Sequence, residues 1–282
     1  KKAVTAKDLS AAGSMAALLK DALAPNLVQT LENNPAFIHG GPFANIAHGC
    51  NTVMATQAAL KLADFVVTEA GFGADLGAEK FFDIKCASAG LDTAAVVLVA
   101  TVRALKRHGG VSKEKLQVPD AAAVERGLGN LEKHVESIRI FGEPPVVVLN
   151  RFGTDSDEEI DVVRRACAAL GVPFAVSDIF EQGGVGGIEM AETVLEHAER
   201  TSQPFRPLYD RAEPVKVKME KIARQMYGAR QVIYTPAAER DLKLIQKLGY
   251  EGLPLCVAKT PTSLSDDPAV AGRPEDFEIT VR

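Results

Sequence analysis

The sequence has no tryptophan, and only four of its 282 residues are cysteines. No two cysteines have C-x-x-C spacing, and each lies in or beside an apolar segment, at Cys50, Cys86, Cys167 and Cys256. This pattern predicts buried, reduced thiols and therefore a protein of a reducing compartment, the cytoplasm.

The chain also lacks a surplus of positive charge and any long apolar run. Its formal net charge is −5 at pH 7, which argues against nucleic acid as a partner. No apolar stretch approaches the roughly 18 residues of a membrane span, so no membrane helix is expected. The first residue is Lys1 rather than methionine, which suggests that the sequence begins inside a longer reading frame or was processed.

Short β-branched runs predict strands, and most of these runs are apolar throughout rather than alternating. Strands of that kind are buried on both faces, which favours a largely parallel sheet covered by helices. The runs are Phe65–Thr68, Ala95–Thr101, Pro145–Leu149, Phe174–Ser177, Gln231–Tyr234, Pro254–Ala258 and Phe277–Val281.

Helical patterns separate these runs, so strand and helix alternate as in a doubly wound α/β fold. One pattern begins with a capping-box signature, Ser156 followed by Glu159. Prolines 204, 207 and 214 mark the best boundary, which predicts a central lobe over 1–203, a linker over 204–214 and a smaller α/β unit over 215–282. The expected helices are 5–23, 43–63, 124–138, 160–170, 190–200, 215–227 and 236–248.

Ligands of open parallel sheets collect beyond the carboxyl ends of the strands. After the first run comes Glu69, which could hold a hydrated Mg²⁺, and then Gly71 and Gly73, whose backbone N–H groups could approach an anion. A tight turn without any ligand would use the same glycines. With Gly77 they also form a variant dinucleotide fingerprint, which keeps a nicotinamide-dependent oxidoreductase as an alternative, although the next strand ends without the ribose-binding acid.

The later loops place two aromatic residues after successive strands. Phe152 and Phe180 could clamp a planar ring from both sides, or could instead turn back into the core. Asn150 could pair with a purine edge, and Arg103 begins close enough to a strand end to reach an anion. The glycine-rich stretch 183–187 follows Phe180.

Several segments resemble the formate–tetrahydrofolate ligase family, and the resemblance extends along essentially the whole chain. The most specific is TEAGFGADLGAEKFFD, a stretch of 16 residues. The segments are His39–Gly49, Thr68–Asp83, Val99–Lys106, Lys259–Asp267 and Gly272–Arg282.

The resemblance implies a P-loop NTPase-like fold and an ATP-dependent ligase. In that family ATP phosphorylates formate, and the formyl phosphate is attacked by tetrahydrofolate to give 10-formyltetrahydrofolate. The family also uses Mg²⁺ and a monovalent cation, K⁺ or NH₄⁺, and forms homotetramers.

The resemblance also implies roles for individual residues. The pterin of folate would stack between Phe152 and Phe180, the second of which stands where the family usually has tryptophan. The formyl phosphate would lie against Gly71, Gly73 and Asp75. The nucleotide would lie beside Asn150, Gly183, Gly184 and Gly186. The predicted catalytic residues are Glu69, Asp75 and Arg103.

One motif of that family is absent from this sequence. No G-x-x-x-x-G-K-[ST] phosphate loop occurs in the 282 residues, so the cradle for the β- and γ-phosphates is missing. We therefore expect a fragment that has little activity alone and needs the missing N-terminal segment as a partner. A non-catalytic folate-binding or assembly module is the alternative.

Overall fold

The computed structural model describes residues 4–41, 43, 48–49, 51–71, 73–142, 144–200 and 204–282. The chain falls into two compact units, the first formed by 1–42 with 50–69 and the second by 43–49 with 70–282. Within the described part of the chain, no helix has both the length and the apolar character that crossing a membrane requires.

The first unit contains a β-hairpin that the sequence did not predict. Its strands pair antiparallel from Asn26 opposite Ile38, and Asn33 in the turn has a positive φ of 65°, which asparagine tolerates better than most residues. The side chain of Thr52 caps the following helix by accepting from the N–H of Ala55. The elements are α1 (Ala12–Leu19), η1 (Asp21–Leu23), β1 (Asn26–Gln29), β2 (Pro35–Ile38) and α2 (Val53–Leu62).

Two expectations for this unit are wrong or incomplete. The run Phe65–Thr68 forms no strand, and Phe65 and Val67 are 67% and 96% exposed. A strand needs a hydrogen-bonded neighbour, and none of the described strands pairs with this run. Only the part of the expected helix 43–63 from Val53 onward is helical, while 44–47 and Cys50 lie outside the described residues.

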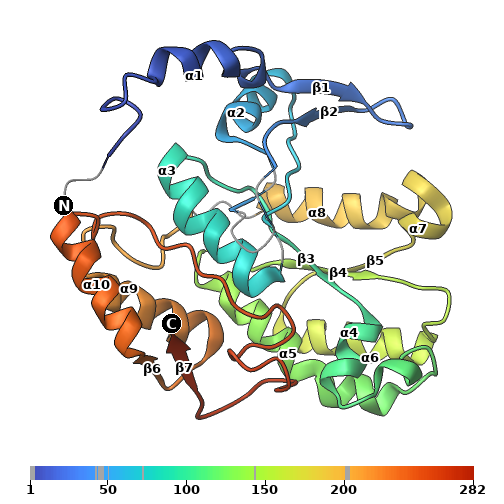
Figure 1. Cartoon of the computed structure of the whole chain (residues 1–282). Coiled ribbons are helices and arrows are strands. Elements are labelled where there is room, and N and C mark those ends of the chain that lie inside the picture. Colours follow the sequence, from blue (N-terminus) through green and yellow to red (C-terminus); the bar gives the residue numbers. More distant parts are fainter. Residues whose placement is uncertain are drawn as a thin grey trace. The chain divides into compact units, whose positions relative to one another are not determined.

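The second unit contains the predicted parallel sheet, with strand order β3-β4-β5. Its strands are β3 (Val97–Ala100), β4 (Val146–Asn150) and β5 (Phe174–Ser177). In the central strand β4 the first four residues are all buried, which explains its unbroken apolar sequence. Figure 1 shows α8 (Ile188–Arg200) on one face of this sheet, and α5 (Ala121–Arg139) with α6 (Asp157–Leu170) on the other. The α/β class is therefore confirmed.

Buried apolar residues and a glycine allow the helices on that second face to pack closely. Val147 and Leu149 of β4 belong to one core with residues of α5, α6 and α4 (Val102–His108). Gly127 of α5 lies against α4, where an added Cβ would stand 2.0 Å from the Leu105 carbonyl oxygen. The predicted capping box at Ser156 and Glu159 is confirmed at the start of α6.

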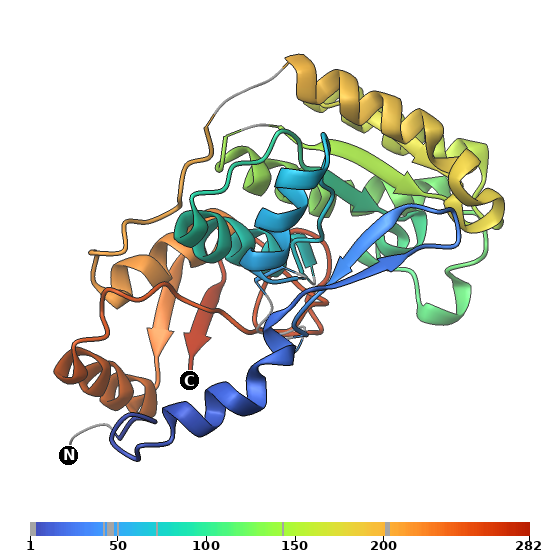
Figure 2. The ribbon, with the colours of Figure 1, turned by 90° about the horizontal axis from the view of Figure 1, so that it is seen from above.

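A second core lies under the C-terminal part of this unit. Phe82 stacks on Phe141 with ring centroids 4.5 Å apart, and Leu208 and Tyr209, from the predicted linker 204–214, are buried in the same core. Strands β6 and β7 pair in parallel (Figure 2), whereas the predicted strand Pro254–Ala258 does not form. The elements here are η2 (Gly73–Ala78), η3 (Phe81–Cys86), α3 (Ala87–Ala89), α9 (Val215–Lys221), η6 (Ile222–Tyr227), β6 (Gln231–Tyr234), α10 (Pro236–Leu248) and β7 (Glu278–Val281).

The cysteines follow the prediction only in part. Cys86 and Cys167 are buried and free of disulfides, and burial raises the pKa of their thiols to about 12 and about 11. Cys256 is exposed, because the segment around it does not form the buried strand that the sequence predicted. Cys50 lies outside the described residues.

Candidate functional site

Three loops at the carboxyl edge of the β3-β4-β5 sheet carry most of the predicted site residues. Thr101 follows β3 and caps α4, which places Arg103 in the first turn of that helix. Asn150 ends β4, Phe152 follows it, and Phe180 lies on the short helix α7 (Ile179–Gln182) after β5. Because the strands are parallel neighbours, their carboxyl ends meet at one edge. The fold thus brings together residues that are far apart in the sequence.

Arg103 and Phe152 are in direct contact at this edge. The guanidinium carbon of Arg103 lies 4.0 Å from the centroid of the Phe152 ring, a cation–π stack. One guanidinium nitrogen, Nη2, also donates to the hydroxyl of Thr154 at 3.3 Å. The Arg103 Nε is buried and has no hydrogen-bond partner among the described residues. One face of the half-buried Phe152 ring is therefore covered by a cation.

The loop that carries Phe152 is closed by hydrogen bonds at both ends. The Phe152 N–H donates to Oδ2 of Asp155 at 2.9 Å, and the Asp155 N–H donates to the Phe152 carbonyl at 2.8 Å. Arg151 bridges to the next loop, since its guanidinium lies 3.8 Å from Asp178 and its N–H donates to the Ser177 carbonyl. The loops after β4 and β5 are therefore held side by side.

The loop after β5 presents an apolar surface. Phe180 is 80% exposed, and the exposed side chains near it in sequence are Ile179, Val185 and Ile188. Backbone conformation and close packing require glycine at two positions of η5 (Gly183–Gly187). Gly183 has φ 63° and ψ −149°, a combination reserved for glycine. An added Cβ on Gly186 would stand 2.5 Å from the Asp178 carbonyl.

The glycine loop before η2 is also tightly packed. Gly71 and Gly73 have positive φ values of 105° and 72°, which side chains rarely adopt. Gly77 packs directly on this turn, because an added Cβ would stand 2.5 Å from the carbonyl of Gly71. The spacing of these three glycines thus follows from a tight turn into a helix and does not require a dinucleotide.

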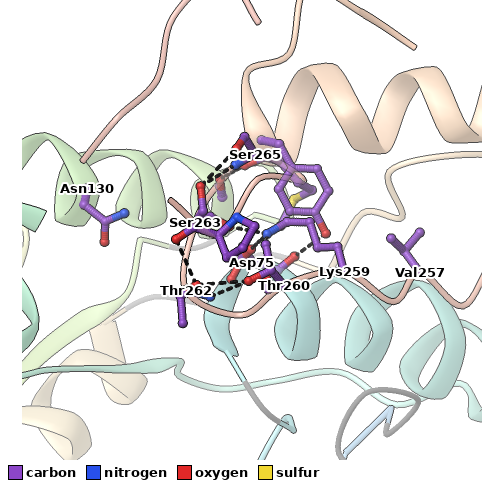
Figure 3. Close-up of polar contacts among 12 residues, drawn as sticks. Asp75, Asn130, Val257, Lys259, Thr260, Thr262, Ser263 and Ser265 are labelled. Carbon is purple, nitrogen blue, oxygen red and sulfur yellow. Dashed lines mark hydrogen bonds and ion pairs between the residues drawn. The ribbon is translucent and has the colours of Figure 1, made fainter. Parts of the chain in front are cut away.

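Asp75 is buried one turn into η2 and pairs with a lysine that the sequence did not point to. Its Oδ2 lies 3.0 Å from Nζ of Lys259, and both side chains are 6% exposed. Nζ also donates to the carbonyl oxygens of Thr260 and Ser263. Figure 3 shows the ammonium group enclosed by the Asp75 carboxylate and the hydroxyl-rich segment that ends at Ser265.

Two ring side chains, Tyr227 and His134, surround this ion pair. The Tyr227 hydroxyl donates to the Asp75 carbonyl at 3.2 Å, and Lys259 Nζ lies 4.8 Å from the centroid of the Tyr227 ring. Burial raises the pKa of Tyr227, with a further rise from the Asp75 charge. Burial lowers the pKa of His134, and the Asp75 charge acts in the opposite direction. Among the described residues, no ion pair or hydrogen bond joins Asp75 to Arg103.

Glu69 is exposed and lies in the first unit, whereas the residues above belong to the second. No group of three or more His, Cys, Asp or Glu side chains in the described ranges could hold a metal ion. The role of Glu69 as an oxygen ligand of a hydrated Mg²⁺ stays a prediction.

A cavity of about 450 Å³ lies beside Lys259 and was not foreseen from the sequence. It opens between η6 and the β6-β7 pair, and most of its lining is apolar. The lining includes Ile222, Tyr227, Val232, Val257, Lys259 and Ile279.

The family of the chain can be stated once this geometry is known. The sequence matches the model of the formate–tetrahydrofolate ligase family over residues 1–282, its whole length. The chain belongs to that family. The resemblance of its motifs to formate–tetrahydrofolate ligases is thereby confirmed, and with it an enzyme family whose substrates are formate and tetrahydrofolate.

Proposed function

We propose that the carboxyl edge of the β3-β4-β5 sheet binds tetrahydrofolate in an ATP-dependent ligation of formate that proceeds through formyl phosphate. The observation that carries this proposal is the pair of aromatic residues on adjacent loops, Phe152 stacked under Arg103 and Phe180 80% exposed. An exposed aromatic beside a half-buried one offers a flat, apolar surface for a planar ring. The pterin of folate is such a ring.

The other residues of the edge fit supporting roles in the same reaction. Asn150 and the glycines at 183, 184 and 186 border the same loops and would contact the nucleotide. Arg103 carries the positive charge nearest to the aromatic surface and would attract an anionic group. ATP supplies the phosphoryl group, and Mg²⁺ and a monovalent cation, when bound, offset the charge of the phosphates.

The glycine loop supports a second part of the proposal. Gly71 and Gly73 would border the formyl phosphate, with Asp75 behind them. Because Asp75 is already paired with Lys259, its role there is to fix the loop rather than to take a proton. This makes the Asp75–Lys259 pair the rigid support of the phosphate side.

The absence of a phosphate loop from the sequence limits what this chain does alone. Phosphoryl transfer depends almost entirely on positioning and charge stabilisation. Without the lysine and backbone cradle of a G-x-x-x-x-G-K-[ST] loop, the isolated chain would form 10-formyltetrahydrofolate slower by orders of magnitude. The proposed active form is a cytoplasmic homotetramer that includes such a loop.

A single assay tests the activity and its rival, a non-catalytic folate-binding module. The missing phosphate loop is what favours that rival. Formation of 10-formyltetrahydrofolate from ATP, formate and tetrahydrofolate is measured for the chain alone and for the chain mixed with an N-terminal phosphate-loop segment of the same family. We expect product only from the mixture. Turnover by the chain alone would refute its dependence on that segment, and binding of tetrahydrofolate without product from the mixture would favour the module.

A further inference from the structure

Asp155 is a buried carboxylate that uses only half of its hydrogen-bonding capacity. It is 6% exposed, and Oδ2 accepts the Phe152 N–H. The other oxygen, Oδ1, is buried and has no hydrogen-bond partner among the described residues. A buried polar atom without a partner costs free energy, so its retention calls for an explanation.

Starting the next helix does not explain Asp155. The following residue, Ser156, is the N-cap of α6, and it forms a complete capping box with Glu159. The N–H groups of Ser156 and Glu159 therefore find acceptors without Asp155. The carboxylate of Asp155 instead accepts a hydrogen bond from the N–H of Phe152, at the other end of the same loop.

Three charged side chains influence the Asp155 carboxylate, and no ion pair joins any of them to it among the described residues. Lys106 of α4 and Glu159 of α6 form a fully buried ion pair with atoms 2.8 Å apart. Burial raises the pKa of Asp155, the negative Glu159 raises it further, and Lys106 and Arg103 lower it. Arg103 is also the cation that covers the Phe152 ring. The same arginine therefore faces both the carboxylate and the aromatic ring.

We propose that Asp155 is a positioning residue for Phe152, which holds the ring in the orientation that receives the pterin of folate. The two hydrogen bonds between Phe152 and Asp155 close a short loop around Thr154, whose hydroxyl binds Arg103. The carboxylate thus holds the backbone of Phe152 directly, and the loop that it helps to close carries Thr154, the hydroxyl partner of Arg103. The inference rests on the proposed function, because it takes tetrahydrofolate as the ligand of that ring.

The test compares Asp155→Asn with Asp157→Asn, a matched control. Asp157 lies two residues away and its side chain is 94% exposed. Calorimetric titration with tetrahydrofolate should show a Kd raised roughly tenfold by Asp155→Asn, equivalent to about 1.4 kcal/mol, and changed less than about twofold by Asp157→Asn. Equal Kd values for the two variants would overturn the inference while leaving the proposed function intact.

A spectroscopic measurement tests the positioning independently of any ligand. A fluorinated phenylalanine is placed at position 152, or at 180 as a control, and its ¹⁹F resonance is recorded in both aspartate variants. We expect Asp155→Asn to shift or broaden the signal from 152 only. An unchanged signal at 152 refutes the inference. A changed signal in a chain that fails to bind tetrahydrofolate even before substitution would support the positioning and refute the proposed function.

If Asp155→Asn fails to fold, the unsubstituted chain still provides a test. Because the pKa of Asp155 is raised, its protonation on acidification should move the ¹⁹F signal at 152 at a pH above the ordinary range of an aspartate. The signal at 180 should not follow the same transition. Identical pH profiles at the two positions would contradict the positioning role.

Discussion

The two polar groups of the second unit, the Asp75–Lys259 pair and the Arg103–Phe152 edge, are built in opposite ways. The first is buried, and its ammonium group lies between the Asp75 carboxylate and two backbone carbonyl oxygens. The second is partly exposed, with a buried guanidinium nitrogen and a buried carboxylate oxygen that have no partner among the described residues. A buried ion pair enclosed by its own chain fixes the local structure, whereas polar groups beside an exposed aromatic surface remain available to a ligand.

The motif stretch before η2 belongs to the first of these two groups. The stretch TEAGFGAD contains both an acid and glycines, and it suggested a ligand pocket. In the structure, its aspartate binds a lysine of the same chain, and its glycines allow close packing. The exposed aromatic surface lies on the loops after β4 and β5, and the glycine turn stays the predicted border of the formyl phosphate.

Substitution of Lys259 should give the largest effect. Lys259→Met leaves the Asp75 carboxylate buried without its cation, and removing one partner of such a pair costs about 3–5 kcal/mol. Urea denaturation followed by circular dichroism measures the loss. Lys216→Met is the matched control, since its pair with Glu239 is exposed at 47% and 40% and should contribute at most about 1 kcal/mol. Similar losses in the two variants would show that the Asp75 pair is not buried as described.

An intermediate effect is expected from a second buried carboxylate, Asp83 of η3. Asp83 is 2% exposed, its Oδ1 accepts the Leu208 N–H at 2.7 Å, and burial raises its pKa from 3.8 to about 6. The nearby Glu79 is 0% exposed, and burial likewise raises its pKa. The folded chain therefore keeps protons that the unfolded chain releases.

The sign of the pH dependence follows from that difference. Between about pH 4 and about pH 6 the folded state binds more protons, so the free energy of unfolding falls as the pH rises. Asp83→Asn keeps the acceptor for the Leu208 N–H and removes the part of this fall in unfolding free energy that comes from Asp83. We expect the variant to be more stable by about 1–3 kcal/mol at neutral pH and equal to the parent near pH 4. Denaturation curves at the two pH values would contradict this if the difference were the same at both.

The smallest effect on stability should come from the open edge. Phe180→Ala removes a side chain that is 80% exposed, so the unfolding free energy should change by less than about 0.5 kcal/mol. Tetrahydrofolate binding should nevertheless weaken by about 1 kcal/mol, because one stacking surface is lost. Phe82→Ala is the contrasting control, since Phe82 is 3% exposed and its loss should cost about 3–5 kcal/mol of stability. A large loss of stability in Phe180→Ala would place Phe180 in the core.

The sequence predicted the elements whose signals are local. The strands at 146–149 and 174–177 and the helix with the Ser156 capping box were found from apolar runs and cap chemistry. The prediction of a strand over 65–68 was wrong because strand formation depends on a neighbouring strand, which the run itself does not reveal. The hairpin of 26–38 was missed because its strands are short and mostly exposed, which leaves no alternating pattern to detect.

By itself, the sequence determined the family, the α/β class, and the set of loops that carry Arg103, Asn150, Phe152 and Phe180. Those features depend on local patterns and on motifs that are contiguous in the chain. Only the tertiary structure decided that Lys259 neutralises Asp75, that Arg103 covers Phe152, and that Asp155 closes the loop behind the ring. The contacts of Lys259 and Arg103 join residues far apart in the sequence, and no spacing rule pairs a carboxylate with a particular distant cation. Their pairing depends on which groups the fold excludes from water together.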